Sequence, residues 1–393
     1  MTAMLSGVRV ISFTHFLQGP SACQLLADLG ADVIKIEPAG GAFERTWTAP
    51  GRFLEGGYSP FFALANRNVR SIVLDLKSPE GLEAVRRLVD GADVLVESFR
   101  PGTMDRLGLG YDELAARNPR LVYTSLSGYG SDGPYKDLPG QDVLVQALSG
   151  LAMATGRGGQ PPTPVGACVV DQHAAVLGAF GILAALHGRE RTGLGTKVES
   201  NLLSAALDLQ IEPLGYKLNG FEPARSATGV SSPFYSAPYG VFETLDGYLC
   251  ISLTSPATLA AAFADAWFTT VPTEELFERR DAINARVADH VRERTTVQWS
   301  HHLAEHRMWF APVQDYDQVL ADPQVLHNDS IDTFHHDRAG EVRVLKHPVQ
   351  YGGERPGVRT PPPDLGAHTD DVLAEIGYAA PQIAELRERG VVA

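Results

Sequence analysis

The stretch that decides the fold is residues 8–36, which read VRVISFTHFLQGPSACQLLADLGADVIKI. Residues 8–13 form a short apolar, β-branched run that is typical of a buried strand. A helix is expected over residues 19–29, because its early proline is tolerated in a first turn and a glycine follows its end. Residues 31–36 then read as a second strand. A strand–helix–strand unit of this kind predicts two parallel strands joined by a right-handed crossover.

The alternation of strands and helices continues to about residue 125. Further strands are expected at 71–76, 93–96 and 121–125, with helices at 79–89 and within 102–117. This pattern predicts an α/β fold, with a doubly wound, Rossmann-like large domain. The first strand–helix turn lacks the G-x-G-x-x-G fingerprint, which argues against a nicotinamide-dependent dehydrogenase.

The rest of the chain predicts a second domain and a return to the first. Long helices are expected at 141–153, at 171–187 with Gly188 as the stop, and at about 197–210. Residues 224–236 read as a crossover, and Asp-Gly between two apolar runs predicts a hairpin of 239–242 with 248–253. We therefore divide the chain into residues 1–224, the first part of the large domain; 225–325, a smaller α+β domain; and 326–393, a C-terminal return to the large domain.

Composition limits the classes of function. The chain has 393 residues and a net charge of −14, which disfavours nucleic acid as a partner but still allows an anionic small ligand. Its three cysteines show no disulfide or zinc spacing. No signal peptide is seen, and no uninterrupted apolar run approaches about 18 residues, so we expect no membrane span and a cytoplasmic protein.

Asp171 is a carboxylate at the junction of an apolar run and a helical pattern. One interpretation is a helix N-cap, which stabilises a helix by about 0.5–2 kcal/mol. The other is a nucleophile that the helix start keeps ionised at neutral pH, with no separate base needed. Small residues on both sides leave room for a bulky acyl group, namely Gly166, Ala167, Ala174 and Ala175. The local sequence leaves both interpretations open.

Other polar residues also have two interpretations. His15 follows the first strand, where α/β proteins bind ligands, so it is either structural or ligand-binding. The remaining histidines lack ligand spacing, and we expect no metal site. Basic residues near predicted strand ends are either solvated or line a cleft for a polyphosphate ligand; they are Arg67, Arg70, Lys77, Arg100 and Arg106.

Seven strings, taken in order, resemble the class III CoA-transferase family, the group of carnitine CoA-transferase and formyl-CoA:oxalate CoA-transferase. Each string is weak alone, but their order and spacing span nearly the whole chain. They are GVRVI with LGADVIKIE (7–37), NR with SIVLDLK (66–77), ADVLVESFRPG (92–102), SGYG (127–130), GILAAL (181–186), TGLGTKV (192–198) and LGAHTD (365–370).

The resemblance implies a fold and a mechanism. Family members are interlaced homodimers with a Rossmann-like large domain built from both chain ends, and they use no metal and no tightly bound cofactor. Coenzyme A enters as the acyl-CoA substrate. The family's catalytic aspartate falls on Asp171, which would form an acyl-aspartyl anhydride and then an aspartyl-CoA thioester that an acceptor carboxylate resolves. N–H groups at the helix start would stabilise the developing negative charge.

The resemblance also implies CoA contacts, at His15, Gln18, Leu74, Lys77, Phe99 and Arg106. Two departures from the formyl-CoA enzyme stand out. Pro38 stands where that enzyme has an arginine, so we expect one phosphate contact to be either lost or replaced, and the enzyme's glycine-rich lid is not visible near 225–255. We expect the acid-binding pocket to draw on 38–60, 139–142 and the second subunit.

The alternatives are a relative of α-methylacyl-CoA racemase and a CoA-binding protein without catalysis. The racemase uses a histidine–aspartate pair as two acid–base groups. Its histidine would fall on Gln141, which cannot remove a proton at neutral pH, so we favour transfer and place Gln141 at the substrate. The acyl-CoA donor, the acid acceptor and the presence of a lid are left open.

Overall fold

The computed structural model describes residues 3–222, 224–228 and 232–393. The chain forms two compact units. The larger comprises Met1–Val145, Cys168–Ala205 and Gln324–Ala393, and the smaller comprises Gln146–Ala167 and Ala206–Pro323. The longer segment of the smaller unit therefore begins at Ala206 rather than at the expected 225, and the unit also includes Gln146–Ala167.

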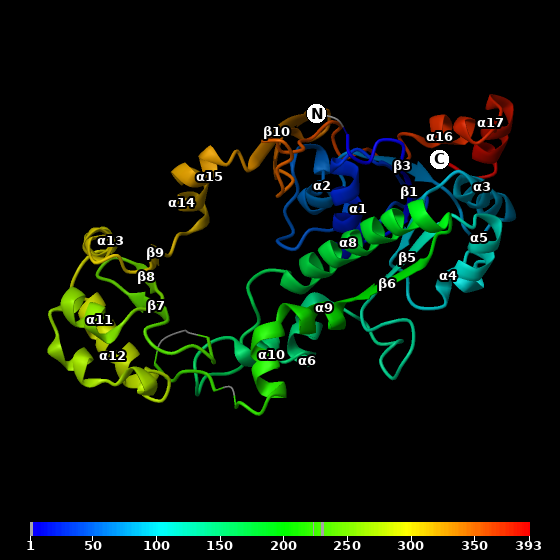
Figure 1. Cartoon of the computed structure of the whole chain (residues 1–393). Coiled ribbons are helices and arrows are strands. Elements are labelled where there is room, and N and C mark those ends of the chain that lie inside the picture. The colour runs from blue at the N-terminus through cyan, green and yellow to red at the C-terminus, as the bar shows by residue number, and fades with distance from the viewer. Residues whose placement is uncertain (1–2, 223, 229–231) are drawn as a thin grey trace. The chain divides into compact units, whose positions relative to one another are not determined.

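A six-stranded parallel sheet forms the centre of the larger unit (Figure 1). Its order is β3-β2-β1-β4-β5-β6, and every neighbouring pair is parallel. The order reverses between β1 and β4, which is the topological switch point of a doubly wound sheet. The strands are β1 (Arg9–Phe13), β2 (Asp32–Glu37), β3 (Val69–Val73), β4 (Val94–Glu97), β5 (Val122–Ser127) and β6 (Lys197–Asn201).

Helices cover both faces of this sheet, because its strands are apolar on both sides. Val10 and Val33 pack in the core with α1 (Gln18–Asp28) and α8 (Val169–Thr192), whereas Ile11 and Ile34 pack in the core of the opposite face. The opposite face is covered by α3 (Pro79–Asp90), α5 (Tyr111–Arg117), α16 (Thr369–Glu375) and α17 (Ala380–Glu388). The C-terminal segment thus packs in the larger unit.

Two expected boundaries around α8 are wrong. The helix continues through Gly188 and ends at Gly193, whose φ of 72° is the left-handed conformation that favours glycine. The expected helix at 197–210 begins instead as β6, followed by α9 (Leu202–Leu209). β6 lies at the end of the sheet order and no residue in it is fully buried, so it lacks the apolar pattern by which the inner strands were recognised.

The smaller unit contains the expected hairpin. β7 (Gly240–Glu243) and β8 (Tyr248–Ile251) are antiparallel, and β9 (Phe310–Pro312) extends the sheet. The expected crossover at 224–236 includes residues 229–231, which lie outside the described residues.

The remaining α-helices and strands, from both units, are α2 (Pro60–Ala65), α4 (Thr103–Arg106), α6 (Asp142–Leu148), α7 (Leu151–Ala154), α10 (Ile211–Leu218), α11 (Pro256–Phe263), α12 (Arg280–Val291), α13 (Thr296–Glu305), α14 (Tyr316–Ala321), α15 (Pro323–His327), β10 (Ile331–His336) and β11 (Gly340–Leu345).

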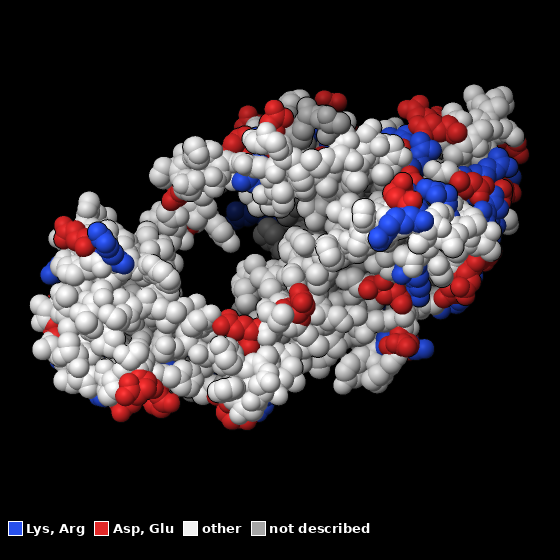
Figure 2. All heavy atoms as spheres, in the orientation of Figure 1, with Lys and Arg blue, Asp and Glu red and all other residues white. Residues whose placement is uncertain are grey.

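α8 has one unusual property. Among the described residues it is the one helix long and apolar enough to cross a membrane by length and composition alone, with a mean hydropathy of 1.6 over 18 residues. Its residues Ala175, Ala179 and Ile182 are buried in the core of the larger unit, as in a core helix. Figure 2 shows charged side chains over α3–α5 and α16–α17, and a largely uncharged surface over most of α8. The expectation of no membrane span stays a prediction.

Candidate active site

The carboxyl ends of the parallel strands bring the first candidate residues together at the switch point. His15 follows β1, and Ser98 and Phe99 follow the neighbouring β4. The Oγ of Ser98 accepts a hydrogen bond from the backbone N–H of His15 at 3.2 Å and lies 3.2 Å from its Nδ1. The imidazole also stacks on Phe99, with ring centroids 6.2 Å apart. Ligands bind at such crevices in open α/β sheets.

The ring of His15 is partly buried, and this burial affects the pKa of the imidazole. Burial lowers the pKa of His15, and the charge of Lys35 adds to this effect, whereas Glu44 opposes it. The imidazole is therefore neutral at physiological pH and can bind a ligand by hydrogen bonding and stacking rather than by charge.

Gln18 is the first residue of α1, a helix that packs against α8. Its Nε2 is buried and has no hydrogen-bond partner among the described residues. One turn later, the Oγ of Ser21 accepts a hydrogen bond from Nε2 of Gln172 at 3.4 Å, which ties the start of α1 to the first turn of α8. A buried amide donor without a partner is costly unless a ligand binds it, so Gln18 remains a candidate for ligand contact.

The other expected CoA contacts divide into two groups. Leu74 follows β3 but is only 1% exposed, and its side chain fills the core of the large unit. Lys77 and Arg106 are exposed, on the turn after β3 and at the end of α4. Their cationic groups are accessible to a phosphate, whereas the buried side chain of Leu74 is not accessible to a ligand.

Asp171 lies inside α8, at its third residue. The N-cap is Cys168, so the interpretation of Asp171 as an N-cap is wrong. The capping carboxylate is that of Asp142, at the start of α6, whose Oδ2 accepts hydrogen bonds from the N–H groups of Val170 at 2.8 Å and of Asp171 at 3.0 Å. Since Asp142 occupies these two helix-start N–H groups, they are not available to stabilise charge on a substrate.

This arrangement places two carboxylates close together. Burial, and then the negative charge of Asp142, raise the pKa of Asp171 from 3.8 to about 7. The expectation that the helix start keeps Asp171 fully ionised at neutral pH is therefore wrong. Asp171 is about half protonated near pH 7, and its charged form is poorly solvated, which favours attack on an electrophile.

Cys168 completes the group around Asp171. One ligand atom from each of Asp142, Cys168 and Asp171 lies within 4.8 Å of the others, a donor set that could hold a cation. Burial, with the charges of Asp142 and Asp171, raises the pKa of the Cys168 thiol, so it is protonated. The prediction that the protein uses no metal stays a prediction.

Asp142 is the residue that sequence reasoning missed. It directly follows Gln141, which is exposed just before α6, and no local pattern shows that its side chain reaches a helix 29 residues away. The sequence does show an acidic residue at the start of the helix that became α6. Such a residue normally stabilises the first turn of its own helix, so it gave no reason to expect a contact with α8.

Three comparisons with known proteins complete the description. The model of CoA-transferase family III matches residues 5–369. An acyl-CoA transferase of Fusarium pseudograminearum is 35% identical, over 99% of this chain and 88% of the relative. The human succinyl-CoA:glutarate CoA-transferase is 31% identical, over 99% of this chain and 90% of the relative. The crystal structure of a CAIB/BAIF family protein from Brucella suis superposes with a TM-score of 0.81 at 30% identity, covering 95% of this chain and 99% of that one.

Proposed function

This chain belongs to CoA-transferase family III, and we propose that it moves CoA from an acyl-CoA thioester to a free carboxylic acid with Asp171 as the nucleophile. One observation carries the proposal for Asp171. Its carboxylate lies in the first turn of α8, a crossover helix that leads into the parallel strand β6. Such a helix begins at the carboxyl edge of the sheet, the same edge that carries His15, and the Ser21–Gln172 hydrogen bond ties the two regions together.

The first half-reaction loads CoA onto the enzyme. An ionised oxygen of Asp171 attacks the thioester carbonyl, the carbon–sulfur bond breaks, and CoA leaves as a thiolate. The thiolate then attacks the aspartyl carbonyl of the resulting anhydride and expels the donor acid as its carboxylate. The product is an aspartyl-CoA thioester.

The second half-reaction reverses these steps with a different acid. The acceptor carboxylate attacks the aspartyl thioester and releases the CoA thiolate again. The thiolate attacks the acceptor's carbonyl in the new anhydride, which gives the new acyl-CoA and restores the Asp171 carboxylate. One nucleophile thus divides a difficult exchange into four simpler steps, and no base is needed once Asp171 is ionised.

Coenzyme A would bind along the carboxyl edge. His15, Gln18 and Phe99 supply stacking and hydrogen-bonding groups near the thioester, and Lys77 and Arg106 supply charge for phosphates. Gln141 would lie at the acid substrate. In this proposal CoA is a substrate, and no metal or tightly bound cofactor takes part.

The donor and acceptor are tested first with compounds suggested by the relatives. The human relative is named for succinyl-CoA and glutarate. Succinyl-CoA is therefore offered as the first donor and acetyl-CoA as a second, each with a panel of mono- and dicarboxylic acids, and new thioesters are separated by chromatography. Asp171→Ala should abolish exchange, whereas Asp289→Ala, at an aspartate that is 79% exposed on α12, should not change it.

Isotope transfer gives the sharper test of mechanism. An acceptor acid labelled with heavy oxygen in its carboxyl group should leave one labelled oxygen on Asp171 after each turnover, detected by mass spectrometry of the peptide. Exchange of thioesters without label on Asp171 would rule out the anhydride route. Deuterium uptake at the α-carbon without an acceptor acid would support the racemase alternative, and CoA binding without any exchange would support a non-catalytic binding protein.

The proposal includes an interlaced homodimer that works in the cytoplasm. In its support, large apolar side chains are exposed in each unit, with Phe180 of α8 at 67%, and Ile211 and Leu218 of α10 at 75% and 78%. Exposed apolar surface of this kind marks interfaces. Light scattering should give a dimer, and Phe180→Glu should shift it toward monomer; a monomeric wild-type protein would contradict the proposal.

A further inference from the structure

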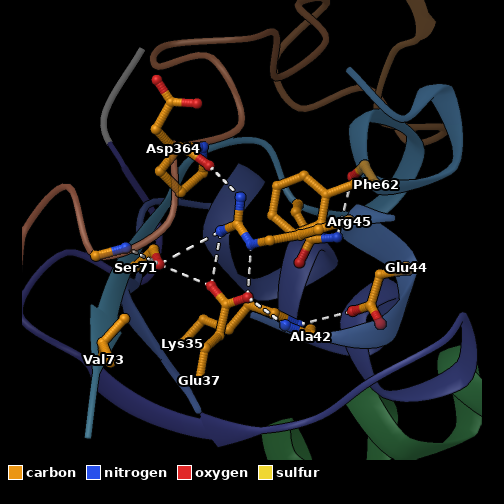
Figure 3. A network of polar contacts seen from close by, with 12 residues as sticks. Lys35, Glu37, Ala42, Glu44, Arg45, Phe62, Ser71, Val73 and Asp364 are labelled. Atoms are coloured by element: carbon orange, nitrogen blue, oxygen red, sulfur yellow. Dashed lines mark hydrogen bonds and ion pairs between the residues drawn. The ribbon is translucent and has the colours of Figure 1, made fainter. Parts of the chain in front are cut away.

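Lys35 and Glu44 form a buried ion pair that the mechanism above does not use. Lys35 is 2% exposed and Glu44, in the short 3-10 helix Phe43–Arg45, is not exposed at all. Their Nζ and Oε1 atoms are 3.1 Å apart (Figure 3). Removing two charges from water is expensive, and apolar residues of similar volume often serve stability equally well. The pair therefore needs a further explanation.

The explanation lies in what else the two side chains bind. The Nζ of Lys35 donates a hydrogen bond to the carbonyl oxygen of Thr14 at 2.8 Å. The Oε2 of Glu44 accepts a hydrogen bond from the backbone N–H of Phe16 at 3.1 Å. The ion pair thus holds the backbone on both sides of His15.

The held segment is strained. Phe16 has a φ of 64°, a left-handed conformation that is unfavourable for a residue with a side chain. The N–H bond to Glu44 is made in this conformation. The ring of Phe16 also stacks on Phe43, the residue before Glu44, with centroids 5.3 Å apart. Strain of this kind persists only where surrounding groups over-determine the backbone.

The neighbouring Glu37–Arg45 ion pair bonds to different segments of the chain from those that Lys35 and Glu44 bond. Arg45 bonds both oxygens of Glu37 and the carbonyl oxygen of Pro363, and Ser71 bonds Glu37 as well. These contacts join β2 to β3 and to the C-terminal segment. Of these two ion pairs, it is Lys35–Glu44 that bonds to the backbone of the loop between β1 and α1, where Ser98 also accepts the N–H of His15.

We propose that Glu44, together with Lys35, is a positioning residue that holds the 14–18 loop in the conformation that binds CoA. The inference rests on the proposed function, because His15 and Gln18 are the CoA contacts in question. It predicts that the pair controls CoA affinity more than the rate of chemistry, since neither residue touches the reacting atoms.

The decisive variant is Lys35→Met/Glu44→Leu. It removes both backbone anchors but leaves no unpaired buried charge, so the fold should be kept. Calorimetry with CoA alone should show a dissociation constant raised about tenfold or more, because the loop is no longer preorganised. The kcat at saturating acyl-CoA should change by less than about threefold, since the reacting groups are intact.

The matched control is Asp28→Asn. Asp28 and Arg67 form a comparably buried pair, 0% and 4% exposed, at the end of α1 remote from the loop. This variant should lose stability in urea but keep CoA affinity within about twofold of wild type.

Three outcomes separate the possibilities. A folded Lys35→Met/Glu44→Leu variant that binds CoA as tightly as wild type would overturn the inference. So would an Asp28→Asn protein that loses CoA affinity to the same extent, because the effect would then be a general loss of stability. A wild-type protein that binds CoA but transfers it to no acid, while the double variant binds CoA weakly, would overturn the proposed function alone and support the inference.

Discussion

The larger unit holds two groups of carboxylates that differ in electrostatics: Asp171, which is partly buried, lies beside another acid, whereas the buried Glu37 lies beside a base. Asp171 has another acid, Asp142, as its neighbour, and burial together with that charge raises its pKa to about 7. Burial also raises the pKa of Glu37, but the hydrogen bonds and charge of Arg45, with help from Lys35 and Ser71, outweigh it and hold the pKa below the usual range. In the proposed function the first group supplies the nucleophile at a cost in stability, whereas the second joins secondary structure elements (Figure 3).

The largest effect is expected when Asp171 of the first group is replaced. Asp171→Asn should lower the rate of transfer by about a thousandfold or more, because an amide is not a nucleophile for thioesters. The same change should stabilise the fold at about pH 8, by on the order of 2 kcal/mol after solvent screening.

The direction in which stability changes with pH follows from proton binding to Asp171. The folded pKa of Asp171 lies above its ordinary value of 3.8, so between these values the folded state binds more protons and the free energy of unfolding falls as pH rises. The penalty is complete above about pH 7 and absent below about pH 4. Urea unfolding of wild type and Asp171→Asn at both extremes measures it, and equal stability at pH 8 would contradict the raised pKa.

The second group should respond in stability rather than in chemistry. Arg45→Met leaves Glu37, which is 1% exposed, without its main partner and should cost about 3–5 kcal/mol of unfolding free energy. Lys217→Met removes an exposed ion pair and should change stability by less than about 0.5 kcal/mol. Urea titration of both variants tests the contrast, and similar small losses for the two would show that Arg45 is not the partner that holds Glu37.

Asp142→Asn should remove the negative charge beside Asp171, so that the first group, like the second, has no repelling neighbour. The asparagine oxygen can still accept the N–H groups of Val170 and Asp171, but the negative charge is gone. The pKa of Asp171 should fall but stay above its ordinary value of 3.8, since burial is the larger cause and remains. Because the ionised form attacks, the rise of kcat/KM with pH should move to lower pH by the same amount, and an unmoved profile would contradict the role of Asp142.

These two groups also show what the sequence can reveal. The parallel sheet followed from alternating apolar strands and helices, and the position of Asp171 at a helix start was visible as an acid after an apolar run. The edge strand β6 was missed because its residues are only partly buried and carry charge. The pKa of Asp171 was misjudged because it depends first on burial and then on a carboxylate 29 residues away, and neither leaves a local pattern in the sequence.

The smallest effect is expected at Cys168, which is exposed beside both acids of the first group. Although the residue is exposed, partial burial of its thiol and the charges of Asp142 and Asp171 raise the pKa of that thiol, so it is a poor nucleophile at neutral pH. Serine keeps its size, and as the N-cap of α8 it is a preferred residue. Cys168→Ser should therefore leave the transfer rate within about twofold, and alkylation of Cys168 should be faster in Asp142→Asn than in wild type, because one repelling charge is gone. A loss of more than about tenfold in Cys168→Ser would instead give the thiol a part in the reaction.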